Sequence, residues 1–295
     1  MKPTTILAAA LAACALAGTA AQADTLKKVA DMGKITVAYR EASVPFSYLA
    51  GSGGPVGFSV EISNAIVDAV KKELNKPALK VDLQAVTSQN RIPLLQNGTI
   101  DIECGSTTNN TVRGKDVQFA INYFYTGTRV AVKKSAGVKN WADLKGKTLA
   151  ITTGTTNLPV VRKYSSENKL DINITQAKDH ADGFLLMEND RAAGFAMDDI
   201  LLYGLKANAK DPALYEIVAD ALQVEPYACM LPKGDAAFKK IVDGVIGGMM
   251  KSGEFTKLYD KWFMQPIPPK NQALGLPMNK ELQDNLAAQS DKPAI

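Results

Sequence analysis

Short apolar strands alternate with amphipathic helical patterns along almost the whole chain, and this alternation limits the possible folds. Strand-like segments lie at 35–39, 81–86, 148–152 and 173–177. Helical periodicity lies between them, at 60–74 and from about 155 to 168. Such alternation is typical of folds in which helices connect the strands of a sheet. The sequence therefore predicts an α/β fold with mostly parallel sheets.

The N-terminus has the pattern of a secretory signal peptide. Lys2 is followed by an apolar run at 6–18 and by the small-residue site Ala-Gln-Ala at 21–23. The apolar run is shorter than the roughly 20 residues that a membrane-spanning helix needs. We therefore expect residues 1–23 to be removed and the mature protein to be soluble and exported. The segment before Cys14 also fits a bacterial lipidation site, so lipoprotein anchoring at Cys14 is the alternative.

The length of the chain favours two lobes. Without the signal peptide, the chain is still longer than most single hydrophobic cores use. The extended runs 126–133 and 225–232 lack helical periodicity, so they are the candidates for crossings between lobes. The two lobes would then consist of residues 24–128 with 229–295, and of residues 129–228.

Charge and cysteine content limit the class of partner and the redox state. The chain has 34 Lys and Arg against 30 Asp and Glu, and this small, scattered excess does not indicate nucleic-acid binding. Loss of the signal peptide leaves only Cys104 and Cys229, in an oxidising compartment. A single disulfide is the simplest interpretation, and two buried free thiols are the alternative.

The segment ECGSTTNNTVRG, at 103–114, combines small hydrogen-bonding side chains with a cation. It follows a predicted strand, and ligands in open α/β sheets bind beyond the carboxyl ends of strands. Hydroxyl groups such as those of Ser106 and Thr108 can donate and accept, and the guanidinium of Arg113 can hold a carboxylate through two hydrogen bonds. The segment predicts part of an anion site, with a solvated surface loop as the alternative.

Two further strand ends carry polar residues. The stretch 152–157, which includes Thr156, precedes a predicted helix with Pro159 in its first turn. The free N–H groups of that helix would favour an anion, and simple capping is the alternative. Asp198 follows an apolar strand at 194–197. Its carboxylate is a candidate partner for a ligand ammonium, with capping of the next helix as the alternative.

Three basic residues complete the candidates. Arg40 follows the first strand, Arg91 precedes a short helix, and His180, the sole histidine, lies in a predicted turn. Each of them alone is typical of a solvated surface residue. Convergence with Arg113 would make the arginines a site for a molecule with more than one negative charge.

The chain has no arrangement typical of catalysis or of metal binding. One histidine and two distant cysteines give no zinc-type spacing. A nucleophile elbow, a P-loop and a Rossmann glycine pattern are also missing from the sequence. These missing patterns argue against an enzyme, and we predict that the protein needs no cofactor and no metal.

Five segments, spread over nearly the whole mature chain, together form a family pattern. They are GFSVEISNAIV at 57–67, LLQNGTIDIECGSTTNNTVR at 94–113, NWADLKGKTLAITTGTTN at 140–157, RAAGFAMDD at 191–199 and SGEFTKLYDKWF at 252–263. In these segments the chain resembles the polar amino-acid-binding proteins of bacterial ABC importers. Residues 38–48, 86–98 and 262–271 are most similar to the members that bind glutamate and aspartate.

The resemblance implies a two-lobed periplasmic binding protein fold of type II, joined by two hinge strands near Cys104 and Cys229. It implies a monomer that captures an acidic L-amino acid, glutamate or aspartate, and delivers it to a membrane ABC permease. Glutamine or a dicarboxylate is the alternative ligand. A cyclohexadienyl dehydratase-like enzyme on the same fold is the alternative from another class.

The resemblance also assigns roles at the α-carbon of the ligand. Arg113 is expected to hold the α-carboxylate, helped by Ser106, Thr108 and the backbone near Thr156. Asp198 is expected to take the α-ammonium.

The side-chain carboxylate of the ligand would be held by Arg40, Ser88, Arg91 and His180. Family members that bind neutral or cationic ligands commonly have an acidic residue where this chain has Arg40. Glutamine would leave the buried arginines unneutralised, at a cost of a few kcal/mol. The chain departs from the family pattern at Ser59, where an acidic residue is usual. Ser43 and Ser88 replace the aromatic rings that sandwich the ligand in many relatives, which favours a polar pocket.

Overall fold

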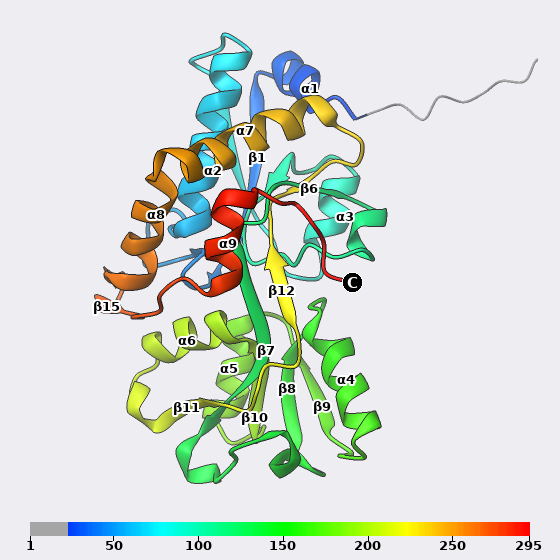
Figure 1. Cartoon of the computed structure of the whole chain (residues 1–295), viewed down its shortest axis with the longest axis vertical. Coiled ribbons are helices and arrows are strands. Elements are labelled where there is room, and N and C mark those ends of the chain that lie inside the picture. Colours follow the sequence, from blue (N-terminus) through cyan, green and yellow to red (C-terminus); the bar gives the residue numbers. More distant parts are fainter. Residues whose placement is uncertain (1–22) are drawn as a thin grey trace, which may run out of the picture.

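The structure is a computed structural model, and it describes residues 23–295. Residues 1–22 of the predicted signal peptide, which include Cys14, lie outside the described residues. Figure 1 shows two lobes, one above the other, with β7 (Phe124–Lys133) and β12 (Val224–Tyr227) running between them. Within residues 23–295, none of the helices combines the length and the apolar character that a bilayer crossing requires.

The upper lobe, lobe 1, contains a five-stranded sheet in the order β4-β1-β5-β13-β6. Its strands are β1 (Lys34–Tyr39), β4 (Lys80–Ala85), β5 (Ile102–Glu103), β6 (Gln118–Phe119) and β13 (Met230–Leu231). Its helices are α1 (Thr25–Met32), α2 (Phe58–Glu73), α3 (Arg91–Gln96), α7 (Ala236–Ser252), α8 (Glu254–Tyr259) and α9 (Lys280–Ala288). Two small hairpins pair β2 (Ala42–Ser43) with β3 (Ser47–Tyr48), and β14 (Pro266–Ile267) with β15 (Gln272–Ala273).

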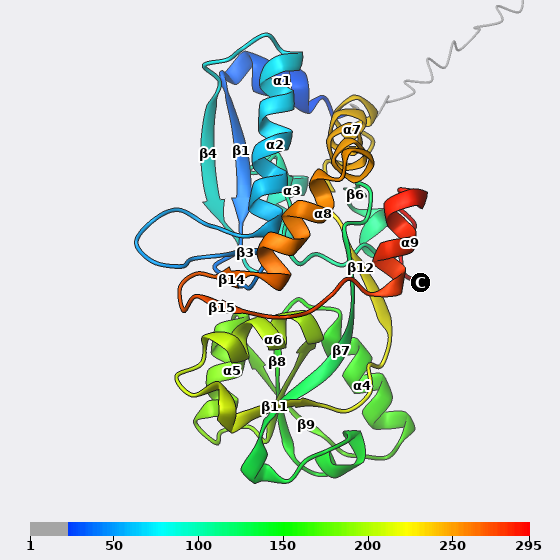
Figure 2. The ribbon, with the colours of Figure 1, turned by 60° about the vertical axis from the view of Figure 1, so that its left-hand side comes forward.

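The lower lobe, lobe 2, contains a sheet in the order β11-β7-β10-β8-β9, and β12 also pairs with β7. Its other strands are β8 (Thr148–Thr152), β9 (Asn173–Ala177), β10 (Gly194–Asp198) and β11 (Tyr215–Val218). Its helices are α4 (Asn157–Glu167), α5 (His180–Glu188) and α6 (Asp199–Asn208). Figure 2 shows α5 and α6 on the side of lobe 2 that faces lobe 1.

The predicted α/β fold is confirmed, but the sheets are mixed rather than mostly parallel. Strands that are connected through helices pair in parallel, as β1 does with β4 and β5, and β8 with β9 and β10. The hinge strand β7 runs antiparallel to β10, β11 and β12, and β13 runs antiparallel to β5 and β6. The reason is that the chain enters these sheets from the opposite lobe, and therefore in the opposite direction.

Apolar periodicity explains how the helices cover the sheets. In α2, the buried residues Phe58, Ile62, Ile66 and Val70 recur every four positions and form one face of the helix. In lobe 2, all five residues of β10 are buried, as expected for a central strand covered on both sides. The strands β1 and β5 are parallel, as are β8 and β10, so each pair places its carboxyl ends, and the loops that follow, at one edge of its sheet.

The predicted disulfide is confirmed. Cys104 and Cys229 are joined, with sulfurs 2.03 Å apart, so the alternative of two free thiols is wrong. The bridge links the end of β5 to the segment between β12 and β13. Closing a loop of this length, 125 residues in sequence, stabilises the fold by about 4–5 kcal/mol in the chain-entropy model.

Candidate functional site

A small, tightly lined cavity lies between the lobes, at the strand ends of both sheets. Its lining residues are Ser88, Arg91, Ser106, Thr108, Arg113, Thr155, Thr156, His180, Met197 and Asp198. Every predicted site residue except Arg40 is therefore among the lining residues.

The polar loop after β5 is not a solvated surface loop. Residues 103–109 are all buried, and Thr108 forms a β-bridge with Tyr227 on the hinge strand β12. The backbone N–H of Asn109 donates to the carbonyl of Pro226 over 2.8 Å. With the adjacent disulfide, these bonds fix the loop against the hinge before any ligand contacts it.

Arg113 extends from this loop toward lobe 2. Its Nη1 donates to the carbonyl of Thr108 (3.0 Å), and its Nη2 donates to the carbonyl of Gly154 in the other lobe (3.2 Å). Burial lowers the pKa of Arg113, and the negative charges of Glu225 and Asp198 oppose this effect. The guanidinium thus connects the two lobes beside the cavity.

The two predicted site residues at helix starts, Thr156 and Asp198, do not act as caps. Thr156 occupies the N-cap position of α4 but makes no capping hydrogen bond, and its hydroxyl donates to Glu225 Oε2 over 2.6 Å. Asp198 occupies the N-cap position of α6, also without a capping bond. It accepts from Asn157 Nδ2 (3.0 Å) and from the hydroxyl of Tyr227. The alternative of simple capping is therefore wrong for both side chains.

The carboxyl group of Asp198 is unusually easy to protonate. Burial, and then the nearby negative charge of Glu225, raise its pKa to about 7. The hydrogen bonds from Tyr227 and Asn157 oppose this shift. A cation placed beside Asp198 would reverse it, because an opposite charge favours the ionised carboxylate.

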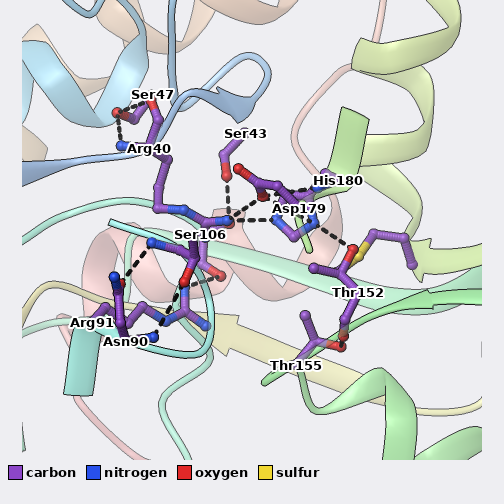
Figure 3. Close-up of polar contacts among 12 residues, drawn as sticks. Arg40, Ser43, Ser47, Asn90, Arg91, Ser106, Thr152, Thr155, Asp179 and His180 are labelled. Atoms are coloured by element: carbon purple, nitrogen blue, oxygen red, sulfur yellow. Dashed lines mark hydrogen bonds and ion pairs between the residues drawn. The ribbon is translucent and has the colours of Figure 1, made fainter. Parts of the chain in front are cut away.

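Arg40 and Arg91 are buried, with 0% and 2% of their surface exposed, so their interpretation as solvated charges is wrong. Figure 3 shows Arg40 directed toward Asp179 and His180 of lobe 2. Its Nη2 donates to Asp179 Oδ1 (2.8 Å) and lies 3.2 Å from His180 Nε2. Arg40 does not line the cavity itself, but it reaches the cavity wall through His180.

His180 is neutral and buried, not a surface residue in a turn. A guanidinium can only donate, so Nε2 of His180 accepts from Arg40 and the ring proton lies on Nδ1, 3.0 Å from the hydroxyl of Thr152. Burial, and then the positive charge of Arg40, lower the pKa of His180 to about 3. The imidazole therefore orients Arg40 without adding a charge.

Arg91 is a buried cation with little compensation. Its Nη1 donates to the carbonyl of Ser106 over a long 3.4 Å, and Figure 3 shows the two side by side. Burial, and then the positive charge of Arg113, lower the pKa of Arg91 to about 9. Among Arg40, Arg91 and Arg113, only Arg40 forms an ion pair within the described residues.

The buried polar atoms without a partner belong to residues that line the cavity and to two residues beside it, Arg40 and Glu103. Within residues 23–295 they are Arg40 Nε and Nη1, Ser88 Oγ, Arg91 Nε and Glu103 Oε1. Buried donors without a partner cost free energy, and native structures rarely keep them without a reason. The unpartnered donors belong to Arg40, Ser88 and Arg91, which were predicted to hold the side-chain carboxylate of the ligand. A carboxylate would accept hydrogen bonds from these donors.

The sequence reasoning missed three acidic residues near the cavity, Asp179, Glu103 and Glu225. Asp179 precedes His180 and begins α5, so it resembles an ordinary helix cap. Glu103 is buried at the end of β5 and accepts from the hydroxyl of Thr107. Glu225 had a detectable signal, because it is a lone charge within an extended segment predicted to cross between lobes.

Residues 35–265 match the bacterial extracellular solute-binding proteins, family 3. The chain belongs to this family. An L-glutamate/L-aspartate-binding protein of Pseudomonas aeruginosa is 50% identical over 92% of this chain and 90% of its own length. A glutamate/aspartate import solute-binding protein of Escherichia coli K12 is 49% identical over 97% of this chain and 96% of its own length. These relatives are binding proteins, not enzymes.

Solved structures of similar proteins agree with the two-lobed fold. An ancestral arginine-binding protein bound to arginine superposes with a TM-score of 0.69 at 27% identity, covering 78% of this chain and 98% of its own. Within the described residues, His, Cys, Asp and Glu side chains form no group of three or more that could hold a metal ion.

Proposed function

We propose that this protein captures L-glutamate or L-aspartate between its lobes in the periplasm and delivers it to a membrane ABC permease. The observation that carries the proposal is the set of unpartnered buried donors on Arg40, Ser88 and Arg91, opposite the buried carboxylate of Asp198. A ligand that pairs with the donors and with Asp198 together has to carry a carboxylate at one end and an ammonium at the other. The names of the relatives at about 50% identity support the same ligand class.

The ligand would lie with its α-carbon near the hinge strands. Arg113 would hold the α-carboxylate, together with Ser106 and the backbone N–H groups at the start of α4. Asp198 would accept from the α-ammonium, which would restore the ionised state of its carboxyl group. The side-chain carboxylate would then reach the donors of Arg40, Ser88 and Arg91, with His180 holding Arg40 in place.

Closure of the lobes is the proposed mechanism. Several contacts cross from one lobe to the other: the ion pair of Arg40 with Asp179, and the hydrogen bond of Arg113 to Gly154. A ligand that bridges the same two walls binds the closed form better than the open form, and so shifts the population toward it. The permease would then recognise the closed form.

Glutamine offers the sharpest comparison with glutamate, because the two molecules differ only at the end of the side chain. The side-chain amide of glutamine cannot neutralise buried Arg91, and its N–H groups would face the N–H groups of the protein. This costs a few kcal/mol of binding free energy. We expect glutamate and aspartate to bind and glutamine to bind at least about a hundredfold more weakly. Calorimetric titration of protein stripped of ligand by unfolding and refolding measures this. Tight glutamine binding without glutamate binding would contradict the proposal.

A dicarboxylate without an amino group is the competing ligand. It does not need Asp198, so Asp198→Ala would spare its binding, whereas the same change would abolish binding of glutamate. Titration of this variant with glutamate and with glutarate therefore separates the two ligand classes. We also propose a monomer, which sedimentation of the protein with and without ligand would test.

A further inference from the structure

Glu225 is a buried carboxylate in the hinge strand β12, with 1% of its surface exposed. It lies opposite Thr126 in the register of β12 with the other hinge strand, β7. Its Oε2 accepts two hydrogen bonds of 2.6 Å, one from the hydroxyl of Thr108 in lobe 1 and one from the hydroxyl of Thr156 in lobe 2. Its Oε1 accepts from the side chain of Gln223. One carboxylate thus holds a cavity-lining hydroxyl from each lobe.

These hydrogen bonds determine what the two threonines can offer a ligand. A hydroxyl has one proton, and both threonines donate theirs to Glu225. Toward the cavity, Thr108 and Thr156 therefore present only lone pairs. Lone pairs attract an ammonium and repel a carboxylate, so the two hydroxyls complement Asp198 rather than Arg113.

The negative charge of Glu225 also favours a ligand ammonium beside Asp198. It is the second cause, after burial, of the raised pKa of Asp198, so the two carboxylates are close enough to repel each other. A ligand ammonium between the hydroxyls and Asp198 would relieve that repulsion in a medium of low dielectric constant.

We propose that Glu225 is a positioning residue for the ammonium of the ligand. It directs the lone pairs of Thr108 and Thr156 toward the ligand and couples this arrangement to closure, since the two threonines come from different lobes. This inference rests on the proposed function, in that it assumes a ligand with an ammonium group.

The test compares two ligands that differ only in the amino group, L-glutamate and glutarate, on wild type and on Glu225→Gln. This substitution keeps the size of the side chain but removes its charge. We expect Glu225→Gln to weaken glutamate binding about ten- to hundredfold. Glutarate, measured by competition with glutamate, should change by less than about threefold. Glu61→Gln, the same change at a carboxylate in α2, is the matched control.

Glu61 also accepts a side-chain hydrogen bond, from Nε1 of Trp262 over 2.7 Å, but it lies outside the set of residues that line the cavity. Its replacement should leave the ratio of glutamate to glutarate affinity unchanged. A fall of both affinities by the same factor in Glu225→Gln would indicate a purely structural role and overturn the inference, as would unchanged glutamate binding. Wild type that binds neither glutamate nor aspartate would instead overturn the proposed function.

Proton release provides a second readout that does not depend on glutarate. The groups that face Asp198 are Glu225 and Tyr227 of β12, Asp199 of α6 and Arg113. Near pH 7 the ammonium of glutamate should drive Asp198 to its ionised form, so wild type should release protons on binding. Titration in buffers of different ionisation enthalpy measures this number. Glu225→Gln should release fewer protons, and an unchanged number would contradict the inference.

Discussion

The two ends of the cavity are built in opposite ways. At the hinge end, the polar side chains of Thr108, Arg113, Thr156, Asp198 and Glu225 have protein partners. At the far end, Arg40, Ser88 and Arg91 retain buried donors without partners in the part of the chain that the structure describes. The hinge end is thus preorganised, whereas the far end is complete only when a ligand supplies a carboxylate.

This difference has a physical basis in the fold. The hinge end is fixed by strand pairing between β7 and β12, by the bridge of Thr108 to Tyr227 and by the disulfide. The far end lies at the ends of separate elements, where no continuous backbone pairing spans the two lobes. In the proposed binding mode, the groups common to all amino acids would be recognised at the rigid hinge end, and the distinguishing side chain at the end that closure completes.

Replacement of Arg91 by methionine should have the largest effect. Arg91→Met removes an uncompensated buried charge and keeps a long side chain, so we expect the free energy of unfolding without ligand to rise by about 1–2 kcal/mol. Glutamate affinity should fall about a thousandfold, because the carboxylate of the ligand loses its main cationic partner. Chemical denaturation and calorimetric titration measure the two quantities.

Arg129 is the matched control for this experiment. Its Nε, Nη1 and Nη2 donate to the carbonyl of Ala219, the hydroxyl of Tyr203 and the carbonyl of Ile217. Arg129→Met should therefore destabilise the protein and leave glutamate affinity nearly unchanged. If Arg91→Met were as destabilising as Arg129→Met, the far end would be as complete without ligand as the hinge end.

Closure itself can be perturbed through Gly204 of α6, which packs against lobe 1. A Cβ at this position would lie 2.4 Å from the carbonyl oxygen of Val44 in the other lobe. Gly204→Ala should weaken glutamate and aspartate equally, by about five- to hundredfold, because the closed form is overpacked while each lobe stays intact. Gly248→Ala in α7, where a Cβ meets no atom within 4 Å, is the control and should have no effect on affinity.

If Gly204→Ala lowered both the affinity and the melting temperature, the substitution would have disrupted the packing of α6 within its own lobe. Small-angle scattering provides the direct measurement. The variant with saturating glutamate should keep a larger radius of gyration than wild type with glutamate.

Much of the fold was predictable from periodicity alone. The segment predicted as a strand at 173–177 is β9, and the helical pattern at 60–74 is α2, shifted by one or two residues. The predicted crossings lie on β7 and on β12 with β13, although the lobe boundaries stay a prediction. The antiparallel pairing of the hinge strands was missed because strand direction depends on which lobe the chain comes from, and local sequence does not carry that information.

The site was predictable only in part, because burial is a property of the assembled fold. Nothing near Arg40 in the sequence distinguishes a buried arginine from a solvated one, and the resemblance to a family, not the local pattern, selected it. Asp179 was missed because its partner, Arg40, is 139 residues away in sequence. Glu225 was missed because its two hydroxyl partners come from different lobes.

The pH dependence of binding should come from the hinge end and not from the sole histidine. Asp198, whose pKa is raised to about 7 by burial and by Glu225, must be ionised to hold an ammonium. Affinity should therefore be highest above pH 7 and fall by up to about tenfold per unit as the pH drops below 7. His180, with a pKa of about 3, stays neutral between pH 5 and 8. Titrations across this range measure the slope. In Glu225→Gln the slope should begin at a lower pH, because the charge that raises the pKa of Asp198 is removed, and an unchanged pH profile would assign the slope to another group.

The smallest expected effect concerns Ser88, whose hydroxyl is buried at the far end without a partner among the described residues. Ser88→Ala removes this group, so stability should stay constant or rise slightly, while glutamate affinity falls about three- to tenfold through loss of one hydrogen bond to the carboxylate. Ser63 is the control, because its buried hydroxyl donates to the carbonyl of Ser59 (2.9 Å). Ser63→Ala should cost about 1 kcal/mol of stability and no affinity. Equal losses of stability in the two variants would mean that Ser88 has a protein partner, and that the far end is complete without a ligand.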